Sequence, residues 1–296
     1  MIGELAAYEG IVCDLDGVVY RGPTAIPHAV ASLGSAGVPV LYATNNASRE
    51  PAVVADHLRG LGLPVADESV VTSSQAAAWV LAERLAVGAS VLAVGGPGVA
   101  AALAERGFEV ATGQVRAVVQ GYGPQVRAID LAEAAYAVES GALWIATNTD
   151  ATLPTDRGIA PGNGTLVAAV ARAVGRGPDQ VAGKPQTPIY ELAAQRQGVD
   201  ITHLLAIGDR LDTDVAGARA AGMASLVVLT GVESLESIER APVELRPTWV
   251  AADLRALVDN NYWEQARALT EEVRRRWQAR DARDRSEPDG TPPAAG

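Results

Sequence analysis

The chain has 296 residues, 48% of them hydrophobic and 20% charged, so it can bury a large core in two domains or in one domain with an insertion. Its net charge of −11 argues against nucleic acid or an anionic membrane as the main partner. The single cysteine, Cys13, excludes an internal disulfide, and no apolar run reaches the roughly 20 residues that a membrane helix needs. No secretory signal is visible, so we expect a cytoplasmic protein.

Short apolar runs alternate with alanine-rich helical stretches along most of the chain. We expect strands over 10–14, 39–44, 90–95, 115–120, 143–147, 204–208 and 225–230. Helical periodicity predicts helices over 27–36, 50–61, 75–85, 131–141, 165–174, 188–197 and 214–221. Strands separated by helices of this length are typical of parallel sheets covered on both faces, so the sequence predicts an α/β fold.

Two aspartates, Asp14 and Asp16, stand at the carboxyl end of the first expected strand. In open α/β sheets this edge is where ligands bind. Two like charges about 4 Å apart repel by roughly 4 kcal/mol at an effective dielectric constant of about 20, unless positive charge lies between them. The pair therefore indicates a cation, a phosphate centre or both.

Three further polar segments end a strand or open the loop after one. Taken singly, each also fits a turn, a helix cap or a solvated loop, and we expect Asp212 to cap the helix that begins near Asp214. The segments contain Thr44, Asn45 and Asn46 after the strand 39–44, Lys184 between Gly183 and Pro185, and Asp209 and Asp214 after the strand 204–208.

The order and chemistry of the four segments resemble the haloacid dehalogenase (HAD) superfamily of aspartate-nucleophile phosphatases. The likeness is to subfamily IIA, which includes p-nitrophenyl, phosphoglycolate, glycerol-3-phosphate and pyridoxal-phosphate phosphatases. It covers the chain from about residue 8 to about residue 258. The resemblance implies a Rossmann-like core with a parallel sheet and an inserted α/β cap domain of the C2 type.

The resemblance also implies roles in phosphoryl transfer. Asp14 is expected to attack phosphorus and form an aspartyl-phosphate, which splits one difficult step into two. Asp16 is expected to protonate the departing oxygen and then to deprotonate the attacking water. The hydroxyl of Thr44 and the N–H groups of the loop at Asn45 and Asn46 are expected to bind the phosphate oxygens.

Positive charge is expected from a lysine and a metal ion. Lys184 is expected to contact the phosphate between the nucleophile and the transferring group. Asp14, the backbone carbonyl of Asp16 and Asp209 are expected to hold Mg²⁺, which prefers oxygen ligands. Asp214 is expected to orient Lys184 or to lie just outside the metal ligands.

The distance along the chain from Asn46 to Lys184 far exceeds one strand–helix step, so we expect the cap between them. Asn148 and Asp150, after the strand 143–147, are the cap residues expected to face the substrate. The resulting predicted division is core at 1–75, cap at 76–181, core at 182–260, a C-terminal helix at 261–285 and a disordered tail at 286–296.

The C-terminal helix carries an apolar stripe at helical spacing. We expect the stripe to dock on the protein's own surface, and a partner or dimer helix is the alternative. It consists of Trp263, Ala266, Leu269, Val273 and Trp277.

We therefore expect a Mg²⁺-dependent phosphatase of a small phosphorylated metabolite, with glycerol 3-phosphate or a similar polyol or sugar phosphate as the first choice. Phosphoglycolate, a nucleotide monophosphate and pyridoxal phosphate are alternative substrates, and a homodimer through the cap is expected. Three other functions stay open: a dehalogenase, a non-catalytic binding protein on the same scaffold, and a nicotinamide-dependent oxidoreductase that uses the glycines at 95–98.

Overall fold

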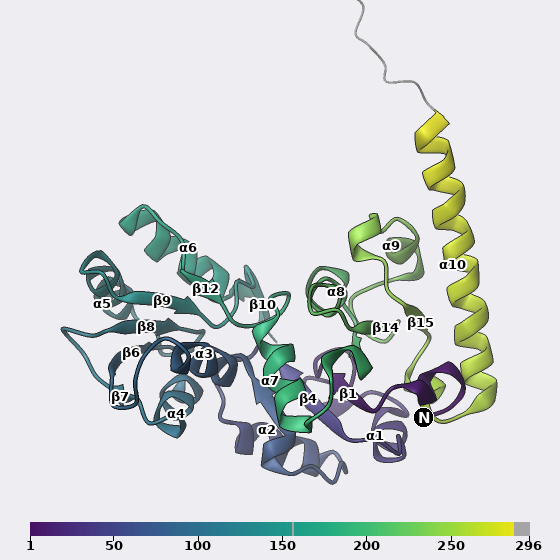
Figure 1. The fold of residues 1–296 in the computed structure, drawn as a ribbon, viewed down its shortest axis with the longest axis horizontal. Helices are drawn as coiled ribbons and strands as arrows, with labels where there is room; N and C mark the ends of the chain where they lie inside the picture. The colour runs from purple at the N-terminus through teal and green to yellow at the C-terminus, as the bar shows by residue number, and fades with distance from the viewer. Residues whose placement is uncertain (156, 287–296) are drawn as a thin grey trace, which may run out of the picture.

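The computed structural model describes residues 1–155 and 157–286, so the tail predicted at 286–296 lies, apart from Ser286, outside the described residues. The chain forms two lobes, each built around a parallel sheet (Figure 1). The first sheet has the strand order β15-β14-β13-β1-β4-β5. Its strands are β1 (Gly10–Cys13), β4 (Val40–Thr44), β5 (Val70–Thr72), β13 (Leu204–Gly208), β14 (Ala224–Val228) and β15 (Trp249–Ala251).

The second sheet is formed by residues between the two halves of the first, where the sequence predicts the cap. Its strand order is β12-β9-β8-β6-β7, and all its pairs are parallel. Its strands are β6 (Ser90–Val94), β7 (Glu109–Val110), β8 (Ala117–Gln120), β9 (Leu143–Ala146) and β12 (Gln180–Val181).

Helices cover both sheets, as expected for parallel strands that are buried on two faces. Around the first sheet lie α1 (Ala29–Gly34), α2 (Pro51–Gly60), α7 (Pro188–Gln197), α8 (Ala216–Ala220), α9 (Leu235–Glu239) and α10 (Asn260–Ser286). The second sheet is accompanied by α3 (Ser73–Ala82), α4 (Pro97–Glu105), α5 (Ala128–Glu139) and α6 (Asn163–Val174). Single turns of 3₁₀-helix lie at Gly3–Ala7, Asp67–Ser69, Ile201–His203, Val243–Leu245 and Leu254–Leu257, and a π-helical turn at Leu211–Val215.

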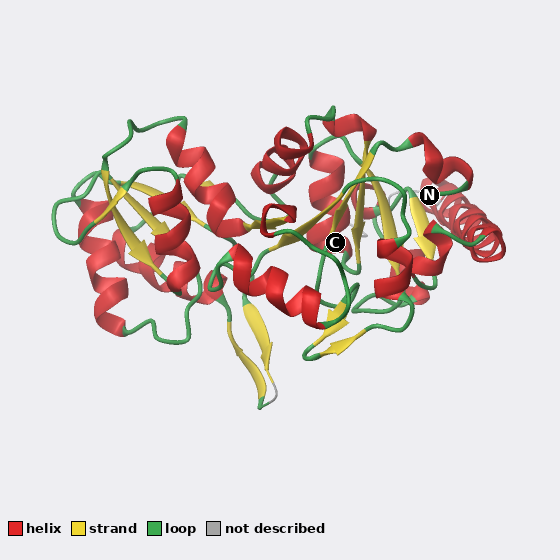
Figure 2. Cartoon of the chain, turned by 90° about the horizontal axis from the view of Figure 1, so that it is seen from below, coloured by secondary structure: helices red, strands yellow, loops and turns green. Residues whose placement is uncertain are grey.

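Two antiparallel hairpins project on the same side of the molecule (Figure 2). One joins β2 (Tyr20–Arg21) to β3 (Thr24–Ala25), directly after the first aspartate pair. The other joins β10 (Thr152–Thr155) to β11 (Gly158–Pro161), directly after the expected cap residues. Each lobe therefore contributes one hairpin next to a segment that the sequence marks as functional.

The long helix α10 runs along the outer edge of the first lobe beside β15 (Figure 1). Trp263, Val273 and Trp277 are buried, and the rings of Trp263 and Trp249 meet edge to face with centroids 5.0 Å apart. Trp277 donates its indole N–H to the carbonyl of Ile238 at 2.9 Å. The prediction that the apolar stripe docks on the protein's own surface is confirmed.

Removing one of these tryptophans should destabilise the first lobe. We expect Trp263→Ala to lower the free energy of unfolding by about 3–5 kcal/mol, because it leaves a cavity against Trp249. Glu264→Ala, on the exposed face of the same helix, removes only a surface ion pair with Arg267 and should cost less than about 1 kcal/mol. Urea unfolding of the two variants measures both changes in the free energy of unfolding. Equal losses would contradict the prediction that the buried tryptophan stabilises the first lobe.

Candidate active site

The parallel register of the first sheet brings the ends of its central strands together. Residue Cys13, the last of β1, pairs with Tyr42 on one side and with Ile207 on the other. The next residue, Asp14, donates its backbone N–H to the carbonyl of Ile207 at 2.8 Å. The polar residues that follow β1, β4 and β13 therefore meet at one edge of the sheet, as the sequence predicts.

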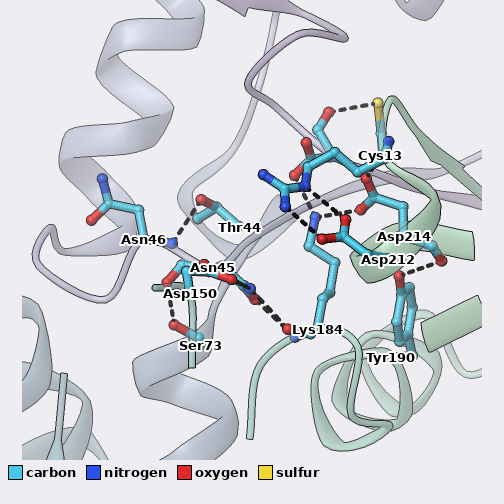
Figure 3. Close-up of polar contacts among 12 residues, drawn as sticks. Cys13, Thr44, Asn45, Asn46, Ser73, Asp150, Lys184, Tyr190, Asp212 and Asp214 are labelled. Atoms are coloured by element: carbon cyan, nitrogen blue, oxygen red, sulfur yellow. Dashed lines mark hydrogen bonds and ion pairs between the residues drawn. The ribbon is translucent and has the colours of Figure 1, made fainter. Parts of the chain in front are cut away.

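Lys184 reaches this edge with its ammonium between two carboxylates, one of which, Asp214, is labelled beside it in Figure 3. Its Nζ donates to Oδ1 of Asp14 and to Oδ1 of Asp214, the latter at 2.8 Å. The Lys184 side chain is 5% exposed and that of Asp14 is 13% exposed. Burial alone would lower the pKa of Lys184, but the charges of Asp14 and Asp214 outweigh it and raise that pKa well above its usual value.

Asp14 and Asp209 carry more negative charge than this one lysine offsets. Burial raises the pKa of Asp14 to about 8 against the opposing charge of Lys184, and the carboxylates of Asp214 and Asp209 add to the rise. Burial, followed by the charge of Asp214, raises the pKa of Asp209 to about 6. A further cation at this edge would keep both groups ionised at neutral pH.

The carboxylates at this edge fit a hard divalent cation. One oxygen from each of Asp14, Asp209 and Asp214 lies within 4.8 Å of the others. Oδ2 of Asp209 accepts the N–H of Val232 at 2.7 Å, whereas its buried Oδ1 has no hydrogen-bond partner among the described residues. A Cβ on Gly231 would stand 1.9 Å from Oδ2 of Asp209, so the glycine leaves room for this carboxylate. All-oxygen donors are those that Mg²⁺ prefers.

Asp214 differs from Asp209 in how its oxygens are used. Oδ1 accepts from Lys184, and Oδ2 accepts the backbone N–H of Arg210 at 3.2 Å. Tyr190, a residue that the sequence did not suggest, donates its hydroxyl to the backbone carbonyl of Asp214 at 3.1 Å. These contacts fit the predicted role of Asp214 in orienting Lys184.

Asp16 follows Asp14 by two residues, just before the β2–β3 hairpin, and forms an isolated bridge with Tyr20. The residue is exposed, yet partial desolvation of its carboxyl group raises its pKa, with the charges of Lys184 and then Arg49 opposing the rise. A carboxyl group whose pKa is raised is better suited to donate a proton near neutral pH.

The loop after β4 holds its three predicted residues differently. Thr44 accepts the backbone N–H of Asn46 at 3.1 Å. The side chain of Asn46 points away from Lys184 and accepts from the N–H and hydroxyl of Ser48 (Figure 3). The side chain of Asn45 instead faces Lys184: its Oδ1 accepts the Lys184 N–H at 2.8 Å, and its Nδ2 donates to the Lys184 carbonyl at 2.9 Å.

The two predicted cap residues reach the same loop from the end of β9. Asn148 donates its Nδ2 to the carbonyl of Asn45 at 2.7 Å. Asp150 accepts from Nδ2 of Asn45 at 3.1 Å, and burial raises its pKa although this hydrogen bond opposes the rise. The second lobe therefore contacts the site through Asn45.

Two details differ from the sequence-based expectations. Asp212 does not cap a helix, because it lies inside the π-helical turn and pairs with Arg210 at 2.7 Å. The glycines at 95–98 do not form an open phosphate loop: a Cβ on Gly96 would stand 2.6 Å from the carbonyl of Ser48. Since the loop after β4 covers the start of α4, the dinucleotide alternative loses its basis.

Comparison with known proteins matches two stretches of the chain to hydrolase families, and the first of them extends from the first lobe into the second. Models described as haloacid dehalogenase-like hydrolase and HAD-hydrolase-like match residues 11–109 and 181–257. The D-glycerol 3-phosphate phosphatase of Mycobacterium tuberculosis is 46% identical over 254 residues, which cover 84% of this chain and 71% of that protein. An acid sugar phosphatase of Staphylococcus aureus is 36% identical over 255 residues, covering 85% of this chain and 97% of the relative.

A solved structure agrees with these relatives. The crystal structure of a glycerol phosphate phosphatase from M. tuberculosis in complex with magnesium superposes with a TM-score of 0.84 at 44% identity. The match covers 88% of this chain and 79% of that chain.

None of the helices in the described part of this chain has the length and apolar character that a membrane crossing requires.

The metal assignment predicts a binding defect that is measurable without substrate. We expect Mg²⁺ to raise the melting temperature of the wild-type chain, because an ion that binds only the folded state stabilises it. Asp209→Asn should weaken Mg²⁺ binding at least about tenfold, because it removes the charge of the carboxylate whose Oδ1 has no hydrogen-bond partner among the described residues. Asp212→Asn should leave Mg²⁺ affinity unchanged, because the Asp212 side chain is 60% exposed and pairs with Arg210 at the surface. Equal affinities in all three proteins, measured by titration calorimetry, would contradict the assignment.

Proposed function

Because this chain belongs to the haloacid dehalogenase-like hydrolase family, we propose that it is a Mg²⁺-dependent phosphatase of small phosphomonoesters. The observation that carries the proposal is the buried ammonium of Lys184 against Asp14, next to the carboxylate of Asp209, one oxygen of which has no hydrogen-bond partner in the described part of the chain. The family resemblance and the predicted α/β fold with parallel sheets are confirmed by the comparisons.

The first chemical step is attack of the Asp14 carboxylate on phosphorus. A bond forms between Asp14 and phosphorus, the bond from phosphorus to the leaving oxygen breaks, and Asp16 donates a proton to that oxygen. Lys184 offsets the negative charge shared by Asp14 and the phosphoryl oxygens. The hydroxyl of Thr44 and the backbone N–H of the next residue bind those oxygens.

The second step hydrolyses the aspartyl-phosphate. Asp16, now ionised, takes a proton from water as the water oxygen attacks phosphorus, and inorganic phosphate leaves with the Asp14 carboxylate restored. Asp14 and Asp209, with the backbone carbonyl of Asp16, would hold Mg²⁺, which supplies charge neutralisation at the phosphoryl group.

The site favours a phosphatase over the other functions that the sequence left open. A dehalogenase needs the first aspartate, but it needs no proton donor for a halide leaving group and no metal. Asp16 and Asp209 would therefore have no role in a dehalogenase. A binding protein without catalysis has no use for a buried nucleophile paired with Lys184. The arrangement therefore supports phosphoryl transfer most directly.

Glycerol 3-phosphate is the proposed substrate, because a similar relative is named as its phosphatase. Sugar phosphates are the next choice on the same ground, followed by phosphoglycolate, nucleotide monophosphates and pyridoxal phosphate. We also propose a cytoplasmic location, with which the one buried cysteine agrees. A homodimer through the cap is proposed as well, and the exposed Ile129 and Tyr136 of α5 would lie in its contact.

The nucleophile assignment predicts a near-complete loss of activity. The wild-type chain with Mg²⁺ should release phosphate from glycerol 3-phosphate and p-nitrophenyl phosphate, and EDTA should stop both reactions. Asp14→Asn should lower kcat at least about 10³-fold, since an amide is a far weaker nucleophile. Asp56→Asn, in a surface ion pair, should keep the wild-type rate.

Phosphate release across sugar, polyol, nucleotide and cofactor phosphates, with and without Mg²⁺, measures these outcomes and ranks the substrates. Substantial turnover by a folded Asp14→Asn variant would refute the nucleophile assignment. No release from any phosphate by the wild-type chain would refute the proposed function.

The proton-donor assignment predicts a dependence on the leaving group. Asp16→Asn should slow hydrolysis of glycerol 3-phosphate at least about tenfold more than hydrolysis of p-nitrophenyl phosphate, because p-nitrophenolate leaves without a proton. Comparing kcat/KM for the two substrates tests this. Equal losses on both would argue against proton donation by Asp16.

A further inference from the structure

The side chain of Asn45 pairs with the backbone of Lys184 in both directions. Its Oδ1 accepts the Lys184 N–H at 2.8 Å and its Nδ2 donates to the Lys184 carbonyl at 2.9 Å. Paired strand residues exchange hydrogen bonds in this way, but here a side chain provides one half of the pair. An amide side chain offers a donor and an acceptor side by side and carries no charge at any pH of interest.

Lys184 depends on this pairing because it lies outside the sheets. Strand β12 ends at Val181 and helix α7 begins at Pro188, so Lys184 belongs to neither element. Backbone groups buried in a protein need partners, and Asn45 provides both for this residue. The start of the lysine side chain is thereby fixed to the loop after β4, while its Nζ contacts Asp14 and Asp214.

The second lobe contacts the same amide. Nδ2 of Asn45 also donates to Oδ2 of Asp150 at 3.1 Å, and the Asn45 carbonyl accepts from Asn148 at 2.7 Å. The segment before Lys184 passes so close that a Cβ on Gly183 would stand 2.5 Å from Oδ1 of Asn45 and 2.5 Å from the carbonyl of Thr147. A shift of the residues that follow β9 would therefore move the partners of the Asn45 amide.

We infer that Asn45 is a positioning residue that holds Lys184 against Asp14, and that Asp150 links this positioning to the cap. The inference rests on the proposed function, because the value of holding Lys184 lies in phosphoryl transfer. Because the Asn45 side chain is bonded to the backbone of Lys184, only the backbone of Asn45 is left to bind phosphate.

An isosteric substitution tests the positioning role. Asn45→Asp keeps an acceptor for the Lys184 N–H but sets a negative charge against the Lys184 carbonyl and Asp150. We expect kcat for p-nitrophenyl phosphate to fall at least about 30-fold while KM stays within about threefold. Ser73→Ala is the matched control, because it removes a hydrogen bond to the Asn45 carbonyl without touching Lys184, and kcat should stay within about twofold.

Exchanging the two groups tests the link to the cap. In the double variant Asn45→Asp/Asp150→Asn, the introduced amide at position 150 can donate to the introduced carboxylate at position 45. The double variant should regain at least about threefold in kcat over Asn45→Asp alone, although Asp150→Asn by itself lowers kcat. Additive losses would overturn the link between Asp150 and Lys184.

Other outcomes separate positioning from phosphate binding. A wild-type kcat for Asn45→Asp would overturn the inference, and so would a rise in KM at constant kcat, which indicates that the side chain binds phosphate. If the wild-type chain hydrolyses no phosphomonoester, the proposed function fails. Crystal structures of the wild type and of Asn45→Asp then still test the positioning role. The Lys184 ammonium should no longer contact Asp14 in Asn45→Asp, and an unchanged contact would overturn the inference.

Discussion

The site depends on one buried ammonium that lies between two carboxylates. Lys184 contacts Asp14 and Asp214, and all three side chains are nearly excluded from water. Leaving one buried charge of such a pair without its partner costs about 3–5 kcal/mol, so the three charges hold one another in place. The lysine alone does not offset the charge at this edge, because burial keeps the pKa of Asp14 high even beside Lys184. A metal ion bound here would supply the missing positive charge.

Three distant parts of the chain must meet for this contact to form. Asp14 directly follows β1, and Asp214 lies in the π-helical turn after β13; because these two strands pair in parallel, the sheet brings the two segments together. Lys184 belongs to neither strand, and in the sequence it follows all five strands of the second sheet. A side chain that no strand positions needs other partners, which is the part we assign to Asn45.

The sequence predicts most of this fold, because buried parallel strands are continuous apolar runs. The strand at Leu204–Gly208 and the helix at Pro188–Gln197 have the predicted bounds. Strands such as β15 (Trp249–Ala251) are too short for any pattern, and α4 (Pro97–Glu105) begins in a glycine-rich segment typical of a loop. The contact of Asn45 with Lys184 was not predictable either, since its partner is backbone that lies 139 residues away.

The same limit applies to the three carboxylates of the cluster, which the sequence cannot tell apart. Hydrogen bonding distinguishes them in the structure. Both oxygens of Asp214 accept from protein donors, whereas Asp209 keeps one buried oxygen without a partner among the described residues. A carboxylate whose oxygens already accept hydrogen bonds has less to offer a cation, while a buried, unpartnered oxygen is costly until a cation binds it. The cluster thus divides into Asp214, whose contacts orient the lysine, and Asp209, which would bind a metal ion, while Asp14 contacts the lysine and would share that ion.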